Sequence, residues 1–300
     1  MTNYALLMAT LTTVPRDVNS DDSGDSDTEY PNVCPMFSGA LPFGMFILNS
    51  TTTIRVQASA TNSSVPNKLF AKDIWYGAVL MAEWLRDHPE LVAKKTVIEL
   101  AAAAALPSIV AHKLEASYVV ATDYPNDELI ANINQQFTMN DITTLSSTAN
   151  ATATAAALPH MWGDIKNIRT LLELTPQSLG YDVVLLAEFL WWDTHCQHDN
   201  ILRSCDALLS QDGVIYASYS HHNPGREALD LEFFQRAVRD YNFEVEDVQS
   251  DLKGYNSVFD EDCQQECFLK RLVRRAVVDD SKDIEQASVP SQKNTENEAY

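Results

Sequence analysis

Two acidic residues, Glu99 and Asp123, lie at the ends of short apolar runs. The runs TVIEL (96–100) and SYVVATD (117–123) are typical of buried strands, so both carboxyl groups are expected at the carboxyl edge of a sheet, where open α/β proteins bind ligands. Asp123 follows Glu99 by 24 residues (99 to 123), close to the spacing of about 20 residues at which an acidic side chain binds ribose hydroxyls. The alternative is that Asp123 caps the next helix, because aspartate is common at helix N-caps.

Five consecutive alanines (101–105) stand where the first of these strands must turn into a helix. Glycine is usual in such a turn, since it accepts a positive φ and lets a ligand approach the backbone N–H groups. Alanine keeps part of this approach, at a cost of about 1 kcal/mol wherever the backbone must be left-handed. No glycine lies between Gly77 and Gly163. The stretch is therefore either a ligand-binding turn without glycine or the alanine-rich start of a helix.

Cysteine and histidine spacings do not favour a metal site. Cys263 and Cys267 are four residues apart, but no second pair has the spacing of zinc ligands. The HCQH stretch (195–198) is a weak signal on its own and is interpreted as a loop cluster. Five cysteines, an odd number without a regular framework, predict free thiols in a reducing compartment.

The elements that would position these residues alternate between strands and helices, which predicts a mostly parallel sheet with helices on both faces. The last two strands need no helix between them and are expected to pair antiparallel. Strands are predicted at 96–100, 117–123, 154–160, 181–189, 214–220, 243–249 and 266–275, and helices at 73–85, 107–116, 127–137, 200–210 and 231–241.

Several smaller features accompany this pattern. Two β-branched runs at 44–58 predict a hairpin ahead of the main domain, and Asp73 is the expected N-cap of the first helix. The tripeptide QDG (211–213) is interpreted as a turn before the fifth strand. The signal between residues 137 and 181 is poor, so only one strand is placed there.

Composition and charge separate the ends of the chain from this domain. Residues 1–33 and 276–300 contain acidic, serine-rich or polar stretches that cannot bury enough apolar surface to fold, 34–66 form the hairpin extension, and 67–275 form the main domain. A formal net charge of −21 argues against nucleic-acid and anionic-membrane partners, because phosphate binding needs a positive surface. A basic protein or a small molecule is the expected partner, and no apolar run is long enough to span a membrane.

Five motifs together resemble those of the class I, S-adenosylmethionine-dependent methyltransferases, most closely the nicotinamide N-methyltransferase-like branch. They are VIELAAAAALPS, VVATDYPNDELIANI, HMWGD, VVLLAEFLW and SHHNPG. That branch includes the fungal enzyme that methylates the N-terminus and a nearby lysine of translation elongation factor 1-alpha. The resemblance runs from about residue 69 to 275. It implies a Rossmann-like fold whose seven-stranded, mostly parallel sheet has an antiparallel final strand.

The resemblance also implies roles for residues around the cosubstrate. Glu99 and the backbone of Ala101 and Ala103 would face the methionine part, Asp123 would bind the ribose hydroxyls, and Tyr124 would lie against the adenine. Three further cofactor-binding residues are implied, namely Trp75, Trp162 and Ala187. Trp162 as an ordinary buried core residue is the alternative, and Gly163 and Asp164 would form the turn after their strand.

On the acceptor side, the resemblance implies Glu188, His221 and Trp191 as catalytic residues. Glu188 replaces the family's usual aspartate and could hydrogen-bond the acceptor amine and favour loss of its proton. Trp191 and Trp192 could hold an amine or its cation by their ring faces, or could simply pack between helix and sheet. His221 or His222 could accept the amine proton, although a turn or capping role suits them equally.

The resulting hypothesis is a cytoplasmic, monomeric N-methyltransferase that uses S-adenosylmethionine and modifies a lysine or N-terminal amine of a protein, with elongation factor 1-alpha as one possible substrate. Methylation of a small amine of the nicotinamide type is the second hypothesis. The third is a non-catalytic binding module that kept the fold, for which the turn without glycine is the supporting feature.

Overall fold

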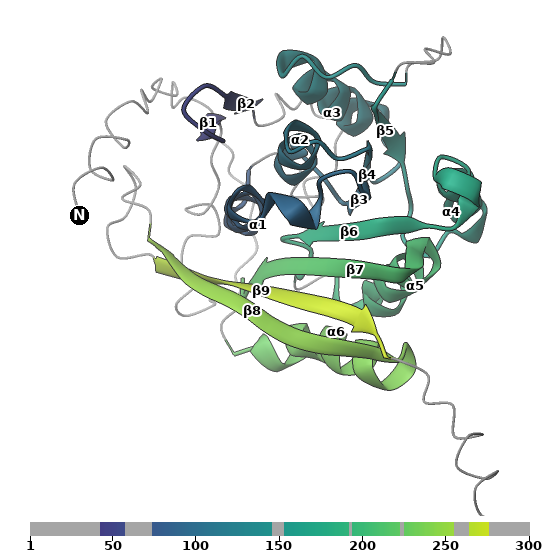
Figure 1. Cartoon of the computed structure of the whole chain (residues 1–300). Helices are drawn as coiled ribbons and strands as arrows, with labels where there is room; N and C mark the ends of the chain where they lie inside the picture. The colour runs from purple at the N-terminus through teal and green to yellow at the C-terminus, as the bar shows by residue number, and fades with distance from the viewer. Residues whose placement is uncertain are drawn as a thin grey trace, which may run out of the picture.

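A sheet with the strand order β5-β4-β3-β6-β7-β9-β8 forms the centre of the computed structural model (Figure 1). The structure describes residues 43–57, 74–145, 153–191, 194–222, 225–254 and 264–275. Within those residues, this sheet has seven strands: β3 (Thr96–Leu100), β4 (Tyr118–Asp123), β5 (Ala155–Pro159), β6 (Tyr181–Ala187), β7 (Leu209–Ser220), β8 (Phe243–Gly254) and β9 (Gln264–Arg274).

The order of strands reverses beside β3. β3 pairs in parallel with β4 on one side and with β6 on the other, although β6 comes much later in the chain. A ligand-binding crevice is expected outside the carboxyl ends of strands at such a reversal. β9 pairs antiparallel with both β7 and β8, so the predicted α/β sheet with antiparallel final strands is confirmed.

Helices cover both faces of the sheet, as the βαβ pattern predicted. α1, α2 and α3 pack on one face, while α4, α5 and α6 pack on the other (Figure 1). Their bounds are α1 (Tyr76–Asp87), α2 (Leu106–Lys113), α3 (Asp127–Met139), α4 (Ile165–Leu172), α5 (His198–Leu208) and α6 (Glu227–Asp240). The described residues also include the short 3-10 helices η3 (Pro89–Leu91), η4 (Pro176–Ser178) and η5 (His195–Gln197).

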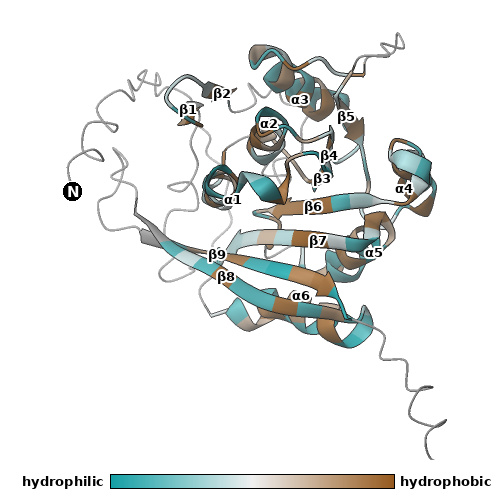
Figure 2. Ribbon diagram, viewed as in Figure 1, coloured by the Kyte–Doolittle hydropathy of each residue, from teal (hydrophilic) through white to brown (hydrophobic). Residues whose placement is uncertain are grey.

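Alternation along the buried strands divides the core into two layers. In β3, Val97 belongs to the cluster under α1 and α2, whereas Ile98 and Leu100 belong to the cluster on the opposite face. Every residue of β3 is buried, because helices cover both faces of the sheet. Strands covered in this way are largely apolar in sequence. Hydrophobic colour accordingly concentrates on β6 and parts of β7, while β8 is largely hydrophilic (Figure 2).

The predicted hairpin is present as β1 (Phe43–Ile47) and β2 (Thr53–Gln57), which pair antiparallel. Phe46 and Leu48, together with Ile54 and Val56, join the core cluster beside α2 and α3. The hairpin is therefore part of the packed domain and contributes to its core.

Three expectations differ from the structure. The tripeptide QDG lies inside β7 and not in a turn before it, at an irregularity of the β6–β7 pairing that separates the pair Tyr181–Leu209 from the pair Val183–Val214. The predicted strand 181–189 ends at Ala187, since Glu188 has a left-handed backbone. α4 was not predicted at all, although its N-cap, Asp164, accepts hydrogen bonds from the amides of Lys166 and Asn167.

Some predictions fall on residues outside the described ones. The terminal segments 1–33 and 276–300 lie there, as do Asp73, Trp192 and Cys263. Within the described part of the chain, no helix is long and apolar enough to cross a membrane, and no cluster of histidine, cysteine and acidic side chains could hold a metal ion.

Candidate active site

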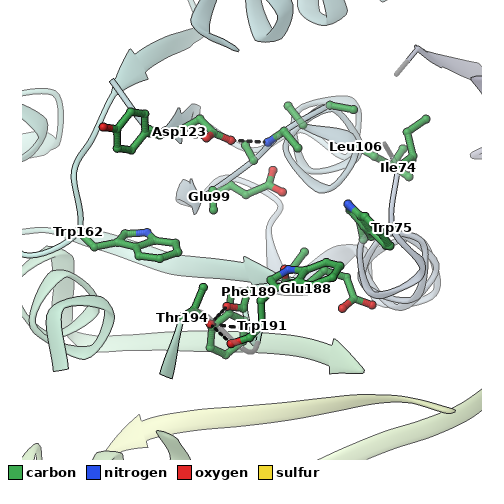
Figure 3. Close-up of a pocket in the computed structure, with 18 of the residues that line it drawn as sticks. Ile74, Trp75, Glu99, Leu106, Asp123, Trp162, Glu188, Phe189, Trp191 and Thr194 are labelled. Atoms are coloured by element: carbon green, nitrogen blue, oxygen red, sulfur yellow. Dashed lines mark hydrogen bonds between the residues drawn. The ribbon is translucent and has the colours of Figure 1, made fainter. Parts of the chain in front are cut away.

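One pocket opens at the carboxyl ends of β3, β4 and β6, beside the reversal of strand order (Figure 3). In the close-up, Trp162 and Trp75 lie on opposite sides of the pocket, with the carboxylate of Glu99 between them. All the predicted site residues except His221 line this pocket: Trp75, Glu99, Ala101, Ala103, Asp123, Tyr124, Trp162, Ala187, Glu188 and Trp191.

The five alanines form a turn and not the start of a helix. Ala101, Ala103 and Ala105 have φ angles of 57°, 47° and 54°, which place all three in the left-handed region. α2 begins only at Leu106, with Ala105 as its N-cap. Each left-handed alanine costs about 1–2 kcal/mol, so this turn needs contacts from the surrounding structure to hold it.

Asp123 supplies one of these contacts. Its Oδ2 accepts a hydrogen bond from the amide of Ala103 at 2.8 Å, and its Oδ1 accepts one from the amide of Tyr124 at 2.7 Å. Burial raises the pKa of Asp123 to about 6, and these two backbone amides lower it. The alternative role as N-cap is wrong, because Asn126 caps α3 by accepting from the amides of Glu128 and Leu129. A carboxylate offers about four acceptor positions, so Asp123 keeps capacity for a ligand.

Glu99 is fully buried at the floor of the pocket. Its Oε2 accepts hydrogen bonds from both the amide and the hydroxyl of Ser108, in the first turn of α2, at 2.9 and 2.5 Å. Burial raises the pKa of Glu99 to about 8, against the lowering effect of Ser108, and the charge of Asp123 raises it further. Glu99 is therefore largely protonated at neutral pH in the free protein.

Glu188 is held from three directions. Its Oε1 accepts from the amide of Gly77 at 2.8 Å and the hydroxyl of Ser220 at 2.6 Å, and its Oε2 bonds the Nε2 of His222 at 2.8 Å. Burial raises the pKa of this carboxyl, but His222, Ser220 and Gly77 outweigh burial and the net shift is downward. A Cβ at position 77 would lie 2.7 Å from the Glu188 Cγ, which explains a glycine in the first turn of α1.

An aromatic wall stands above Glu188, made by Trp75, Trp191 and His222. The rings of Trp191 and His222 are stacked with centroids 3.7 Å apart, and Trp75 meets Trp191 edge-on at 4.6 Å. The indole nitrogen of Trp191 donates to the backbone oxygen of Glu188 at 2.8 Å. Thr194 completes this loop by accepting from the Trp191 amide and contacting the Phe189 oxygen. The wall is thus fixed to the carboxylate that supports it.

His221 does not join the pocket lining. Its Nδ1 bonds the Oδ2 of Asp230 at 2.8 Å, and the Oδ1 of the same carboxylate bonds the Nε2 of His195 at 2.7 Å. Asp230 is buried on α6 and so ties the loop after β6 to the loop after β7. The structure brings His222, and not His221, to the aromatic wall.

Sequence reasoning missed the supporting residues Ser108, Gly77, Ser220 and Asn132. Ser220 bonds Glu188 from 32 residues away, and Asn132 donates to the Ala103 carbonyl from 29 residues away, so no local pattern could identify either contact. Gly77 did carry a signal, because it is a glycine within an otherwise apolar helix and such a glycine often marks a close approach.

Comparison with known proteins places the sequence among characterised relatives, although no protein-family model matches it. It is 31% identical over 189 residues to the protein N-terminal and lysine N-methyltransferase EFM7 of Candida glabrata, covering 63% of this chain and 69% of that protein. The EFM7 protein of Debaryomyces hansenii is 33% identical over 192 residues, covering 63% and 71%.

The EFM7 protein of Eremothecium gossypii is 34% identical over 177 residues, and that match covers 59% of this chain and 64% of the relative, slightly under two thirds of its length. Among solved structures, ribosomal protein L11 methylase from Lactobacillus delbrueckii subsp. bulgaricus is 18% identical with a TM-score of 0.41, covering 65% of this chain and 76% of that chain. The fold is assigned from the strand order of the sheet.

Glycine substitutions should separate strain from packing within the alanine turn. Ala103→Gly is expected to raise the free energy of unfolding by about 0.5–1 kcal/mol, because relief of the left-handed strain exceeds the added chain entropy. Ala104→Gly, at a neighbouring buried position without a positive φ, is expected to lower it by about 1 kcal/mol. Urea denaturation of both variants measures the difference, and equal destabilisation would contradict the left-handed turn.

The buried acid Glu99 should make stability depend on pH. Its folded pKa lies above its ordinary value, at about 8, so its contribution to stability is present below pH 4.5 and is lost as pH rises through 8. Asp123, with a pKa of about 6, makes the unfolding free energy depend on pH over a lower pH range. Glu99→Gln is therefore expected to flatten the fall in unfolding free energy between pH 6 and 8. Urea titrations across this window test it, and an unchanged slope in the variant would contradict the assignment.

Proposed function

Because the chain belongs to the family of the protein N-terminal and lysine N-methyltransferases EFM7, we propose that it transfers a methyl group from S-adenosylmethionine to an amine nitrogen of a protein. The observation that carries the proposal is the single pocket in which Glu99, Asp123 and the alanine turn meet the aromatic wall. Both halves of a methyl-transfer site, one for the cosubstrate and one for the acceptor, are then adjacent.

The residues present fit S-adenosylmethionine, which is the cosubstrate and supplies an electrophilic methyl group. Glu99 would hold its ammonium group, since a buried carboxyl with a raised pKa is well suited to meet a cation and give up its own proton. Asp123 would accept from the ribose hydroxyls while it keeps its bond to Ala103. Tyr124 and Trp162 would lie against the adenine, and small side chains at Ala101 and Ala187 leave room for the ligand.

On the acceptor side, we assign different roles to the aromatic rings and to Glu188. Trp191 and Trp75 present ring faces and edges to the pocket, where an amine or its cation can be held by the ring. Glu188 acts as a positioning residue, because its carboxylate already bonds Gly77, Ser220 and His222, and its ionised state adds a negative field that attracts a cationic lysine or N-terminus. Alignment of the amine with the methyl group supplies most of the acceleration.

Of the three residues first expected to be catalytic, Trp191 keeps a direct role in this proposal. Glu188 supports the wall, and His221 acts through Asp230 on the loops around the pocket. Proton loss from the acceptor is secondary to alignment in this proposal, since an amine needs to be neutral only at the moment of displacement.

A protein acceptor agrees with the relatives' names and with the charge of −21, which steers basic partners toward the chain. Elongation factor 1-alpha is the acceptor to test first, and lysine or an N-terminal amine is the target group. We propose a cytoplasmic monomer, in keeping with an odd number of cysteines in the chain.

Methyl transfer tests the proposal directly. The unmodified protein, incubated with methyl-labelled S-adenosylmethionine and recombinant elongation factor 1-alpha, is expected to label the factor. Asp123→Ala should reduce labelling at least 100-fold, because it removes the ribose acceptor and one anchor of the turn together. Asp127→Ala, an exposed acid at the start of α3, is the matched control and should leave labelling unchanged.

Other outcomes would point elsewhere. Labelling of nicotinamide in place of the protein would transfer the activity to small amines. Equal labelling by the unmodified protein and Asp123→Ala would remove the assigned cosubstrate site, and no labelling of any acceptor together with no cosubstrate binding would indicate a binding module.

A further inference from the structure

The peptide groups of Ala103 are held from two directions. Asp123 accepts from its amide, and the side-chain Nδ2 of Asn132, on α3, donates to its carbonyl oxygen at 3.2 Å. Ala103 is half-buried and has a φ of 47°, so its left-handed geometry is maintained by these two bonds without help from a glycine. Asn132 is itself only 8% exposed.

The orientation of the Asn132 amide is fixed by a second amide one helical turn away. The Nε2 of Gln136 donates to the Oδ1 of Asn132 at 3.1 Å, which leaves the Nδ2 of Asn132 to face the alanine turn. Gln136 has no exposed surface, and residues four apart on a helix lie on the same face.

The orientation of Gln136 is set in turn by backbone of the hairpin. The amide of Gln57 donates to its Oε1 at 3.0 Å, and its Nε2 donates to the Gln57 carbonyl at 2.8 Å. A backbone N–H can only donate and a carbonyl can only accept, so Gln136 has one possible orientation. Asn140 repeats the pattern with the amide and carbonyl of Arg55.

These contacts form an amide ladder, defined as Asn132 and Gln136 on α3 and Asn140 at its C-cap. It connects β2 of the hairpin to the turn that lines the pocket. Each of these side chains is buried and has hydrogen bonds at both its oxygen and its nitrogen. The nitrogen of Asn132 is the group that reaches the turn. A ladder with a single orientation fixes the geometry more firmly than an isolated amide.

We propose that Asn132 is a positioning residue for cosubstrate binding, held in place by the hairpin through Gln136, and that it compensates for the missing glycine at position 103. This inference rests on the proposed function, because the turn is taken as part of the S-adenosylmethionine site. It assigns to the hairpin a role in ligand affinity as well as in core packing.

The test measures binding of S-adenosylhomocysteine by calorimetry to the full chain and its variants. Asn132→Ala is expected to weaken binding about tenfold, which corresponds to about 1.4 kcal/mol. In a background of Ala103→Gly the same substitution should cost threefold or less, since glycine adopts the left-handed geometry without an anchor. Gln135→Ala, exposed on the same helix, is the control and should bind as the unmodified protein does.

A second readout needs no ligand. Hydrogen exchange of the amides in 101–105 should be faster in Asn132→Ala than in Gln135→Ala, because one of the two anchors of Ala103 is lost. Asn132→Leu, which has a similar volume and lacks the donor, replaces the alanine variant if that variant does not fold. Its expected loss of affinity and faster exchange are the same.

The failures can be told apart. If the unmodified protein does not bind S-adenosylhomocysteine, the proposed function fails and this inference fails with it. If the unmodified protein binds, but Asn132→Ala binds equally well, only the inference is overturned. A loss of affinity that Ala103→Gly does not reduce would also overturn it, because Asn132 would then act by a route other than Ala103.

Discussion

The hydrogen bond from the Ala103 amide to Asp123 joins the two strands on which the pocket depends. It closes a turn that, without glycine, carries three left-handed residues. At about 1–2 kcal/mol for each residue, the turn would not keep this geometry without external contacts. We propose that the carboxylate that anchors it also accepts from a ribose, so that the support of the turn and the binding of a ligand would share one side chain.

A similar arrangement exists on the other side of the pocket. Glu188 has a φ of 51° directly after β6, and its carboxylate connects the first turn of α1 to the polar end of β7 through Gly77 and Ser220. His222 extends this contact to the stacked ring of Trp191. Two acidic residues, each at a strand end with strained backbone beside it, therefore set the geometry of the two halves of the pocket.

Much of the fold could be predicted because parallel strands covered on both faces appear as uninterrupted apolar runs. TVIEL and YDVVLLA are largely apolar in this way. The acidic residues near the ends of such strands lie at the same edge of the sheet because the strands are parallel. α4 was missed because it is short and follows a stretch of low complexity. The tripeptide QDG was assigned to a turn from its composition alone, whereas it lies inside β7 where the pairing with β6 skips from Leu209 to Val214.

Partner choice in the site could not be predicted. That Asn126 and not Asp123 caps α3, or that His221 faces Asp230 while its neighbour His222 faces Glu188, depends on which groups meet in space. The same holds for Asn132, whose contact with Ala103 spans two elements and whose orientation depends on the hairpin.

We propose that the turn built from alanine forms a working cosubstrate site above a protonated Glu99. Calorimetric titration of S-adenosylmethionine into the unmodified protein at pH 7, in two buffers of different ionisation enthalpy, tests it most directly. Micromolar binding to one site with net release of a proton is the predicted result, because a bound ammonium group favours the ionised form of a carboxyl whose pKa is about 8 in the free protein. No detectable heat at millimolar ligand would contradict the claim.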